Sequence, residues 1–188
     1  PAVSALETKR VRFSGTAGFD KHGNAFRAGS SNTTQYVGPP SPDIDSAWES
    51  LIAGRYFTIT EKEAQQYFGT EYTQYYKDPK MGLDVLHTLH CLNILRKALY
   101  PEYYVRHHSN STFGRYHLEH CVDIIRQSIQ CHSDITPIPL RWFSSVNTTF
   151  IDSDQVHTCK NFQKVREWAT ERFNGSLAVY KKTYDGHF

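Results

Sequence analysis

The spacing of apolar residues predicts two long helices in the middle of the chain. Over residues 83–100 apolar side chains recur on nearly every side of a helical wheel, and Pro101 then ends the pattern. A second helical pattern covers residues 113–130, after the polar connector 106–112. Because the first helix is apolar around most of its circumference, we expect it to be buried.

Smaller elements are expected on the N-terminal side of these helices. A short helix should take Asp45 or Ser46 as its N-cap and should end at Gly54. The alternation over residues 55–59 predicts a short strand.

Two further helices are predicted. Thr60 followed by Glu63 has the pattern of a capping box, so a helix is expected over residues 61–68, closed by Gly69. Near the C-terminus, residues 156–173 carry apolar side chains at helical spacing and predict a terminal amphipathic helix.

The two ends of the chain differ from this helical middle. Residues 1–42 are punctuated by glycines and end in a run of prolines, which predicts an extended arm. Residues 43–176 hold the helical patterns, and residues 177–188 are expected to form a C-terminal tail. The expected fold class is mainly α: a small helical core with two facing helices, long loops and room for a short β-hairpin.

The motif H-x-x-H-C occurs once in each long helix, and the two copies begin thirty residues apart. Its members are His87, His90 and Cys91 in the first copy and His117, His120 and Cys121 in the second. Side chains at positions i and i+3 of a helix are neighbours, roughly 5–6 Å apart at Cβ, so each pair of imidazoles can bind one metal ion. We predict that the two copies face each other and hold a metal, as helical bundles build such sites.

The motif differs from two well-known zinc motifs. It lacks the spacing and the glutamate of the protease motif H-E-x-x-H, and its cysteine directly follows a histidine, unlike zinc-finger spacing. Four neutral imidazoles suit zinc, copper, nickel or iron. Non-haem iron usually takes a carboxylate ligand. Asp84, Glu119 and Asp123 are near the motif histidines in sequence, so iron stays a possible metal.

Sequons and cysteines indicate the secretory pathway. Four N-x-S/T sequons begin at Asn32, Asn110, Asn147 and Asn174, and each is a candidate glycosylation site. The cysteines are even in number, and in an oxidising lumen such a set most simply forms two disulfides.

Three cysteine pairings are open, and we favour one of them. A Cys91–Cys121 bridge would clamp the two helices, and a Cys131–Cys159 bridge would bring His157 near the same region. The ligand set would then be nitrogen only, which in an oxidising compartment favours copper and oxygen chemistry. Free thiolates would instead favour zinc or Cu(I).

Composition excludes several classes of protein. The chain is 39% hydrophobic and 14% aromatic, which is typical of a globular protein. The formal net charge is +2 and no basic stripe stands out, so a nucleic-acid partner is not expected. No run of about 18 apolar residues predicts a membrane span, and no signal peptide is visible.

The two motif copies, in their context, resemble the fungal UstYa-like oxidase family. Residues 84–97 read D-x-x-H-x-x-H-C-L-N-x-L-R-K, and residues 117–131 read H-x-x-H-C-V-D-x-x-R-Q-S-x-x-C. The sequences Asp-Ile-Thr-Pro at 134–137 and His-Thr-Cys at 157–159 follow, and the likeness covers residues 45–172.

The resemblance implies oxidative tailoring of a ribosomally made or related fungal peptide natural product, by macrocyclisation or C–H oxidation. It assigns metal binding to His87, His90, His117 and His120. Our mechanistic hypothesis adds one or two copper ions as the expected cofactor and molecular oxygen as co-substrate. It also implies a lumenal domain behind a single N-terminal type II membrane anchor, with residues 1–42 as the remnant of a stem, and a homologous subunit as partner.

A second hypothesis comes from a different class of protein. The chain would be a non-catalytic lumenal accessory subunit whose histidines and cysteines form a structural zinc or disulfide core. Its surface would then bind a tailoring enzyme.

Overall fold

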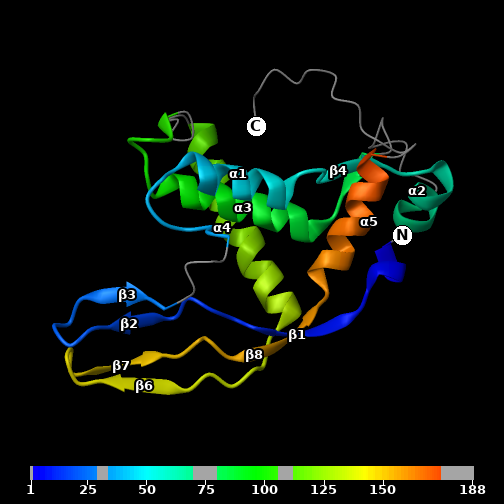
Figure 1. Cartoon of the computed structure of the whole chain (residues 1–188). Helices are drawn as coiled ribbons and strands as arrows, with labels where there is room; N and C mark the ends of the chain where they lie inside the picture. The colour runs from blue at the N-terminus through cyan, green and yellow to red at the C-terminus, as the bar shows by residue number, and fades with distance from the viewer. Residues whose placement is uncertain (1, 29–33, 70–79, 106–111, 175–188) are drawn as a thin grey trace.

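The computed structural model describes residues 2–28, 34–69, 80–105 and 112–174 (Figure 1). This part of the chain contains five α-helices, which confirms the mainly α fold class. They are α1 (Pro42–Ile52), α2 (Glu61–Phe68), α3 (Asp84–Ala98), α4 (Thr112–His132) and α5 (Phe162–Asn174). A 3-10 helix, η1 (Ala2–Ala5), precedes them.

The strands form small antiparallel pairs between the helices. They are β1 (Thr8–Arg12), β2 (Ala17–Phe19), β3 (Ala25–Arg27), β4 (Tyr56–Thr58), β5 (Lys80–Gly82), β6 (Leu140–Phe143), β7 (Thr148–Ile151) and β8 (Val156–Lys160). In the described residues the pairs are β1 with β8, β2 with β3, β4 with β5, and β6 with β7. Figure 1 shows the β2–β3 and β6–β7 hairpins together at one end, away from the layer of α1 and α3.

The N-terminal segment contributes to a sheet with the C-terminal part of the chain. Thr8 pairs with Lys160 and Arg12 with Val156, so β1 lies along β8. The segment also holds the 3-10 helix η1 and the β2–β3 hairpin, and its description as an extended arm stays a prediction. The proposed division of the chain at residue 42 stays a prediction.

Helix α1 begins earlier than the sequence predicted. Its N-cap is Ser41, whose hydroxyl accepts a hydrogen bond from the Ile44 amide at 3.3 Å, and Pro42 occupies the first turn. The prediction of Asp45 or Ser46 as N-cap was therefore wrong. The N–H of the first helical residue has no partner within the helix, so proline, which lacks this group, is tolerated there. Its fixed φ also suits that position, so the helix can start at Pro42.

Helix α2 confirms its predicted bounds. The Thr60 hydroxyl accepts from the Glu63 amide, and the Glu63 carboxylate accepts from the Thr60 amide at 2.9 Å. Gly69 follows with φ of 76°, a left-handed conformation that glycine adopts without strain.

The helix predicted over residues 156–173 was wrong in its first part. Val156–Lys160 is strand β8, and the helix starts only at Phe162. The β-branched side chains of Val156 and Thr158 favour a strand, and β1 supplies the backbone partner. The Asn161 amide donates to the Glu7 carbonyl at 2.6 Å and extends this pairing up to the helix.

Helices α3 and α4 pack against each other and build the core that carries both motif copies. Cys91, Ile94 and Cys121 are buried in this cluster, with Leu118 and Ile124 packed around it. The expectation that α3 is buried on nearly all sides was wrong. Leu92 and Leu99 are exposed in the described structure, because no described element covers that face of the helix.

Helix α4 is 21 residues long and carries charged side chains along its length. No helix in the described ranges combines the length and the apolar character needed to cross a membrane.

Candidate metal centre

The four motif histidines lie together where α3 and α4 pack, which confirms that the two copies face each other. The ring centroids of His87 and His120 are 5.8 Å apart, and those of His90 and His117 are 6.4 Å apart. The first histidine of each copy therefore pairs with the second histidine of the other. Within α3, His87 and His90 are separated by 6.3 Å, so two cross-helix pairs lie side by side.

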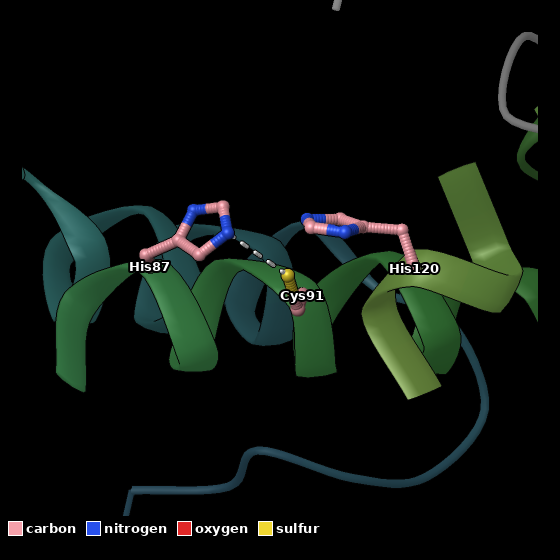
Figure 2. A group of neighbouring side chains, drawn as sticks. All are labelled: His87, Cys91 and His120. Atoms are coloured by element: carbon pink, nitrogen blue, oxygen red, sulfur yellow. Dashed lines mark hydrogen bonds between the residues drawn. The ribbon is translucent and has the colours of Figure 1, made fainter. Parts of the chain in front are cut away.

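One group of donor atoms is especially compact. The ligand atoms of His87, Cys91 and His120 all lie within 4.8 Å of one another. The distance from His87 Nε2 to Cys91 Sγ is 3.7 Å. Figure 2 shows the rings of His87 and His120 on either side of the Cys91 sulfur, with His120 reaching in from α4. Cys91 is buried, His87 is half-buried and His120 is exposed, so one side of the group is open to solvent.

This donor set fits a transition metal. Metal–nitrogen bonds of about 2.0–2.1 Å and metal–sulfur bonds of about 2.3 Å place tetrahedral N and S ligands about 3.5 Å apart. Burial is the main cause that lowers the pKa of His87, and the nearby His120 lowers it further. Burial also lowers the pKa of His90 to about 4. Both imidazoles are therefore neutral at neutral pH and offer a lone pair to a metal.

The buried cysteines are neutral thiols in this arrangement. Burial raises the pKa of Cys91, and burial together with a hydrogen bond to Cys91 raises the pKa of Cys121 to about 12. The two side chains contact each other inside the core, as a clamp between α3 and α4 requires. Cys131 is exposed and Cys159 is half-buried, and all four cysteines are free thiols in this structure. The two predicted disulfides stay predictions.

The three carboxylates considered as ligands of an iron ion form hydrogen bonds with side chains of their own helices. Asp84 accepts from the Thr88 hydroxyl at 3.4 Å. Arg115 donates to Glu119 at 2.9 Å. Arg126 donates to Asp123 at 2.7 Å. None of these carboxylates belongs to the compact donor group found in the described residues.

His157 lies at a different place in the fold. It stands on β8, and its partner is Asp134, in the loop that follows α4. His120 precedes the end of α4 by twelve residues, which is about 18 Å along the helix at 1.5 Å per residue. The structure therefore does not bring His157 to the four motif histidines.

Two of the four sequon asparagines are in the described structure, and both are exposed. Asn147 lies in the turn between β6 and β7 with φ of 49°, and Asn174 is the last residue of α5. Asn32 and Asn110 lie outside the described residues. Glycosylation stays a prediction at all four positions.

Sequence reasoning missed Arg55: burial is the main cause that lowers the pKa of His90 and of His87, and the Arg55 charge adds to it in both. Arg55 directly precedes β4, which pairs with β5, and β5 leads into α3, the helix that carries His87 and His90. In the sequence, Arg55 stood out only as the first residue of the strand predicted over 55–59, and the sequence did not show which strand would pair with it.

The comparison with known proteins agrees with the motif. The family described as "Mycotoxin biosynthesis protein UstYa" matches residues 1–172. The chain belongs to the UstYa family. The resemblance seen in the motif is therefore confirmed over nearly the whole chain.

The similar proteins are named UstYa family oxidases. The oxidase phomYd of Diaporthe leptostromiformis is 41% identical over 151 residues, which cover 78% of this chain and 50% of phomYd. The oxidase phomYc of the same fungus is 34% identical over 71% of this chain and 57% of phomYc. The oxidase aprY of Aspergillus flavus is 31% identical over 70% of this chain and 45% of aprY.

This chain thus spans about half the length of these UstYa family relatives. No solved structure matches it.

Proposed function

We propose that this UstYa family chain is a metal-dependent oxidase, and that its site is the group of four histidines between α3 and α4. The observation that supports this most directly is the pairing of His87 with His120 and of His90 with His117 across the two helices. The oxidase names of the similar proteins support the same class of activity.

The four histidines would hold the metal, and we propose copper because the set is rich in neutral imidazoles. Bound copper supplies one-electron oxidation and the activation of molecular oxygen. The protein contributes ligand geometry. Helix packing fixes the imidazoles before the metal binds, and burial keeps His90 unprotonated at neutral pH. The buried Cys91 and Cys121 hold the two helices together beneath the site.

The proposed substrate is a ribosomally made or related fungal peptide. The proposed reaction is an oxidative macrocyclisation or C–H oxidation. Membership in a family described by mycotoxin biosynthesis supports this substrate class. One side of the donor group is accessible through the exposed His120, so a peptide side chain can approach from there.

We further propose that the protein works in the lumen of the secretory pathway, behind an N-terminal membrane anchor and together with a homologous subunit. The exposed sequon residues Asn147 and Asn174 are accessible to glycosylation there.

A second candidate function is a structural zinc centre in an accessory subunit. The 3.7 Å separation of His87 Nε2 and Cys91 Sγ favours it, because this distance suits a tetrahedral zinc site with mixed nitrogen and sulfur ligands.

Metal analysis of histidine variants tests both candidates. His87→Ala and His120→Ala should each lower the bound copper at least about tenfold, and oxygen consumption with a tyrosine-containing peptide should fall with it. His132→Ala is the matched control, since His132 is an exposed histidine on α4, the helix that also carries His120. Full copper content and activity in the His87 and His120 variants would contradict the proposed site. Stoichiometric zinc without oxygen consumption would favour the accessory subunit.

A further inference from the structure

A groove with a volume of about 780 Å³ lies between α1 and α5, and none of the four motif histidines lines it. Ligand pockets in proteins have volumes of roughly 300–1,000 Å³, so this groove has room for several side chains of a ligand. Helix α1 also packs against α3, the helix that carries His87 and His90. The groove is therefore a separate site, on a helix that adjoins the candidate metal centre.

One face of each helix lines the groove. The lining residues of α1 are Asp43, Ser46, Ala47, Ser50 and Leu51. The lining residues of α5 are Phe162, Gln163, Arg166, Glu167, Thr170 and Glu171. Spacings of three and four residues place side chains on one side of a helix, so two regular helix faces form most of the groove.

Arg166 ties the two helices together beside the groove. Its guanidinium donates to the carbonyl oxygens of Ala53 at 2.5 Å and of Ser50 at 3.2 Å, at the C-terminal end of α1. The last carbonyls of a helix have no partner within the helix and commonly accept from a basic side chain. The one cationic side chain among the lining residues is thus used within the protein, and it holds the groove in shape without a ligand.

The groove is negatively charged. Three of its lining residues are carboxylates: Asp43, Glu167 and Glu171. Neither Asp43 nor Glu171 has a hydrogen-bond or ion-pair partner on its side chain in the described ranges. Glu167 accepts a hydrogen bond from the amide of Gln163 at 2.9 Å, but this neutral donor does not compensate its charge.

The positions of the two glutamates on α5 are unfavourable in the free protein. Glu167 and Glu171 are four residues apart, and like charges at this spacing repel each other on a helix surface. Glu171 is also three residues from Asn174, the last residue of α5, where the helix dipole disfavours an anion. A cationic ligand in the groove would relieve both effects.

The residues of the groove suit a basic side chain better than a metal ion. The three carboxylates do not form a group of ligand atoms within 4.8 Å of one another, unlike His87, Cys91 and His120. Half-buried apolar side chains also line the groove: Ala47, Leu51 and Phe162. Lysine and arginine pack their aliphatic stems on apolar surface while the charged end reaches a polar partner.

We propose that the groove between α1 and α5 is a second peptide-binding site, which binds lysine or arginine side chains of the peptide substrate. This inference rests on the proposed function, since it concerns the proposed substrate class. The basic segment would bind at the groove while another segment of the same peptide reaches the histidines. Binding energy from such a remote segment helps to position the reacting part of a substrate.

Binding of short peptides to the metal-free protein tests the proposal. The probe is an acetylated pentapeptide amide that alternates lysine and alanine and contains three lysines. Its matched analogue carries norleucine in place of each lysine, so it keeps the aliphatic stems and lacks the ammonium groups. In isothermal titration calorimetry the lysine peptide should bind at least about tenfold more tightly, because its hydrogen bonds to carboxylates are charge-assisted. In an NMR titration the largest shifts should fall on the backbone amides of Ser46, Ser50 and Thr170.

Variants assign the preference to the groove. The double variant Asp43→Asn/Glu171→Gln should bind the lysine peptide about as weakly as the wild type binds the norleucine peptide. The matched control is Glu49→Gln/Glu102→Gln, which also removes two exposed carboxylates, neither of which lines the groove. This control should keep the affinity within about twofold of the wild type, because exposed charges more than a Debye length from the ligand are largely screened at physiological salt.

Equal affinity of the wild type for the lysine and norleucine peptides, or no measurable binding of the lysine peptide, would overturn the proposal. A loss in the control as large as that in the groove variant would do the same, since it would show attraction to the overall charge. NMR shifts centred on α4 instead of α1 and α5 would also refute it. These measurements need no metal, so their outcome is separate from that of the copper analysis.

Discussion

The imidazole Nδ1 of His157 lies 2.5 Å from the Asp134 carboxylate, and the ring stacks on Phe13 with 3.7 Å between ring centroids. This contact joins three segments that are far apart in the sequence: the end of β1, the loop after α4, and β8. Asp134 also accepts from the amide and the hydroxyl of Thr136, which fixes the carboxylate in place. His157 thus attaches the C-terminal end of α4 to the β1–β8 sheet.

Replacing His157 should therefore affect stability and not the metal. His157→Ala removes a buried ring, its stacking on Phe13 and its hydrogen bond, so we expect the free energy of unfolding to fall by about 2–4 kcal/mol. Urea denaturation measures this loss. Copper stoichiometry of the folded variant should match the wild type, and loss of copper at full stability would mean that His157 serves the metal centre.

The pair formed by Arg96 and Asp45 should contribute strongly to stability. The Arg96 side chain is 5% exposed and donates to Asp45, Asn93 and the hydroxyl of Tyr104. Arg96→Leu leaves the Asp45 carboxylate without its cation, and we expect a loss of about 2–4 kcal/mol in urea denaturation.

The matched control is an exposed pair. Arg115, whose side chain is 84% exposed, binds Glu119, and Arg115→Leu should cost less than about 1 kcal/mol. Similar losses in the two variants would show that the buried network does not stabilise the fold more than a surface pair.

Acid should weaken the contact between α2 and α5. The Arg172 guanidinium is the main cause that lowers the pKa of Glu63 from 4.5 to about 2. The folded-state pKa lies below the unfolded one, so this contribution to stability is complete above about pH 4.5. It is lost as the pH falls from there towards 2.

The comparison of Glu63→Gln with the wild type isolates this contribution. At pH 7 the variant should be less stable by about 1–3 kcal/mol, because a charge-assisted hydrogen bond and half of the capping box are weakened. The difference should shrink as the pH falls below 4.5. A difference that stays constant down to pH 2.5 would contradict the assignment.

The two histidine pairs should differ in their importance for the metal. The ligand atoms of His87 and His120 already lie within 4.8 Å of each other and of Cys91, whereas His90 and His117 are not part of this group. We expect the double variant His90→Ala/His117→Ala to retain copper with about tenfold or greater loss of affinity. The double variant His87→Ala/His120→Ala should retain none at the same concentration. Competition with a chelator of known affinity measures both, and equal losses would show that the two pairs contribute equally to metal binding.

Much of the site could be predicted from the sequence, because its signals are local. The spacing of His87 and His90 and of His117 and His120 places each pair on one side of a helix, whatever surrounds it. The capping box at Thr60 and Glu63 likewise determined the bounds of α2, since a cap needs only one turn of chain.

Other features depended on contacts between distant segments, and only the tertiary structure decided them. Residues 156–160 became a strand because β1, nearly 150 residues earlier, supplies hydrogen bonds that a local helical pattern cannot reveal. The pairing of β4 with β5 placed Arg55 next to the segment that leads into α3, and His157 found its partner in Asp134, just after the C-terminal end of α4. The sequence by itself determined which side chains form the candidate centre, and the tertiary structure determined which charges surround it, because Coulomb interactions depend on distance in space and not along the chain.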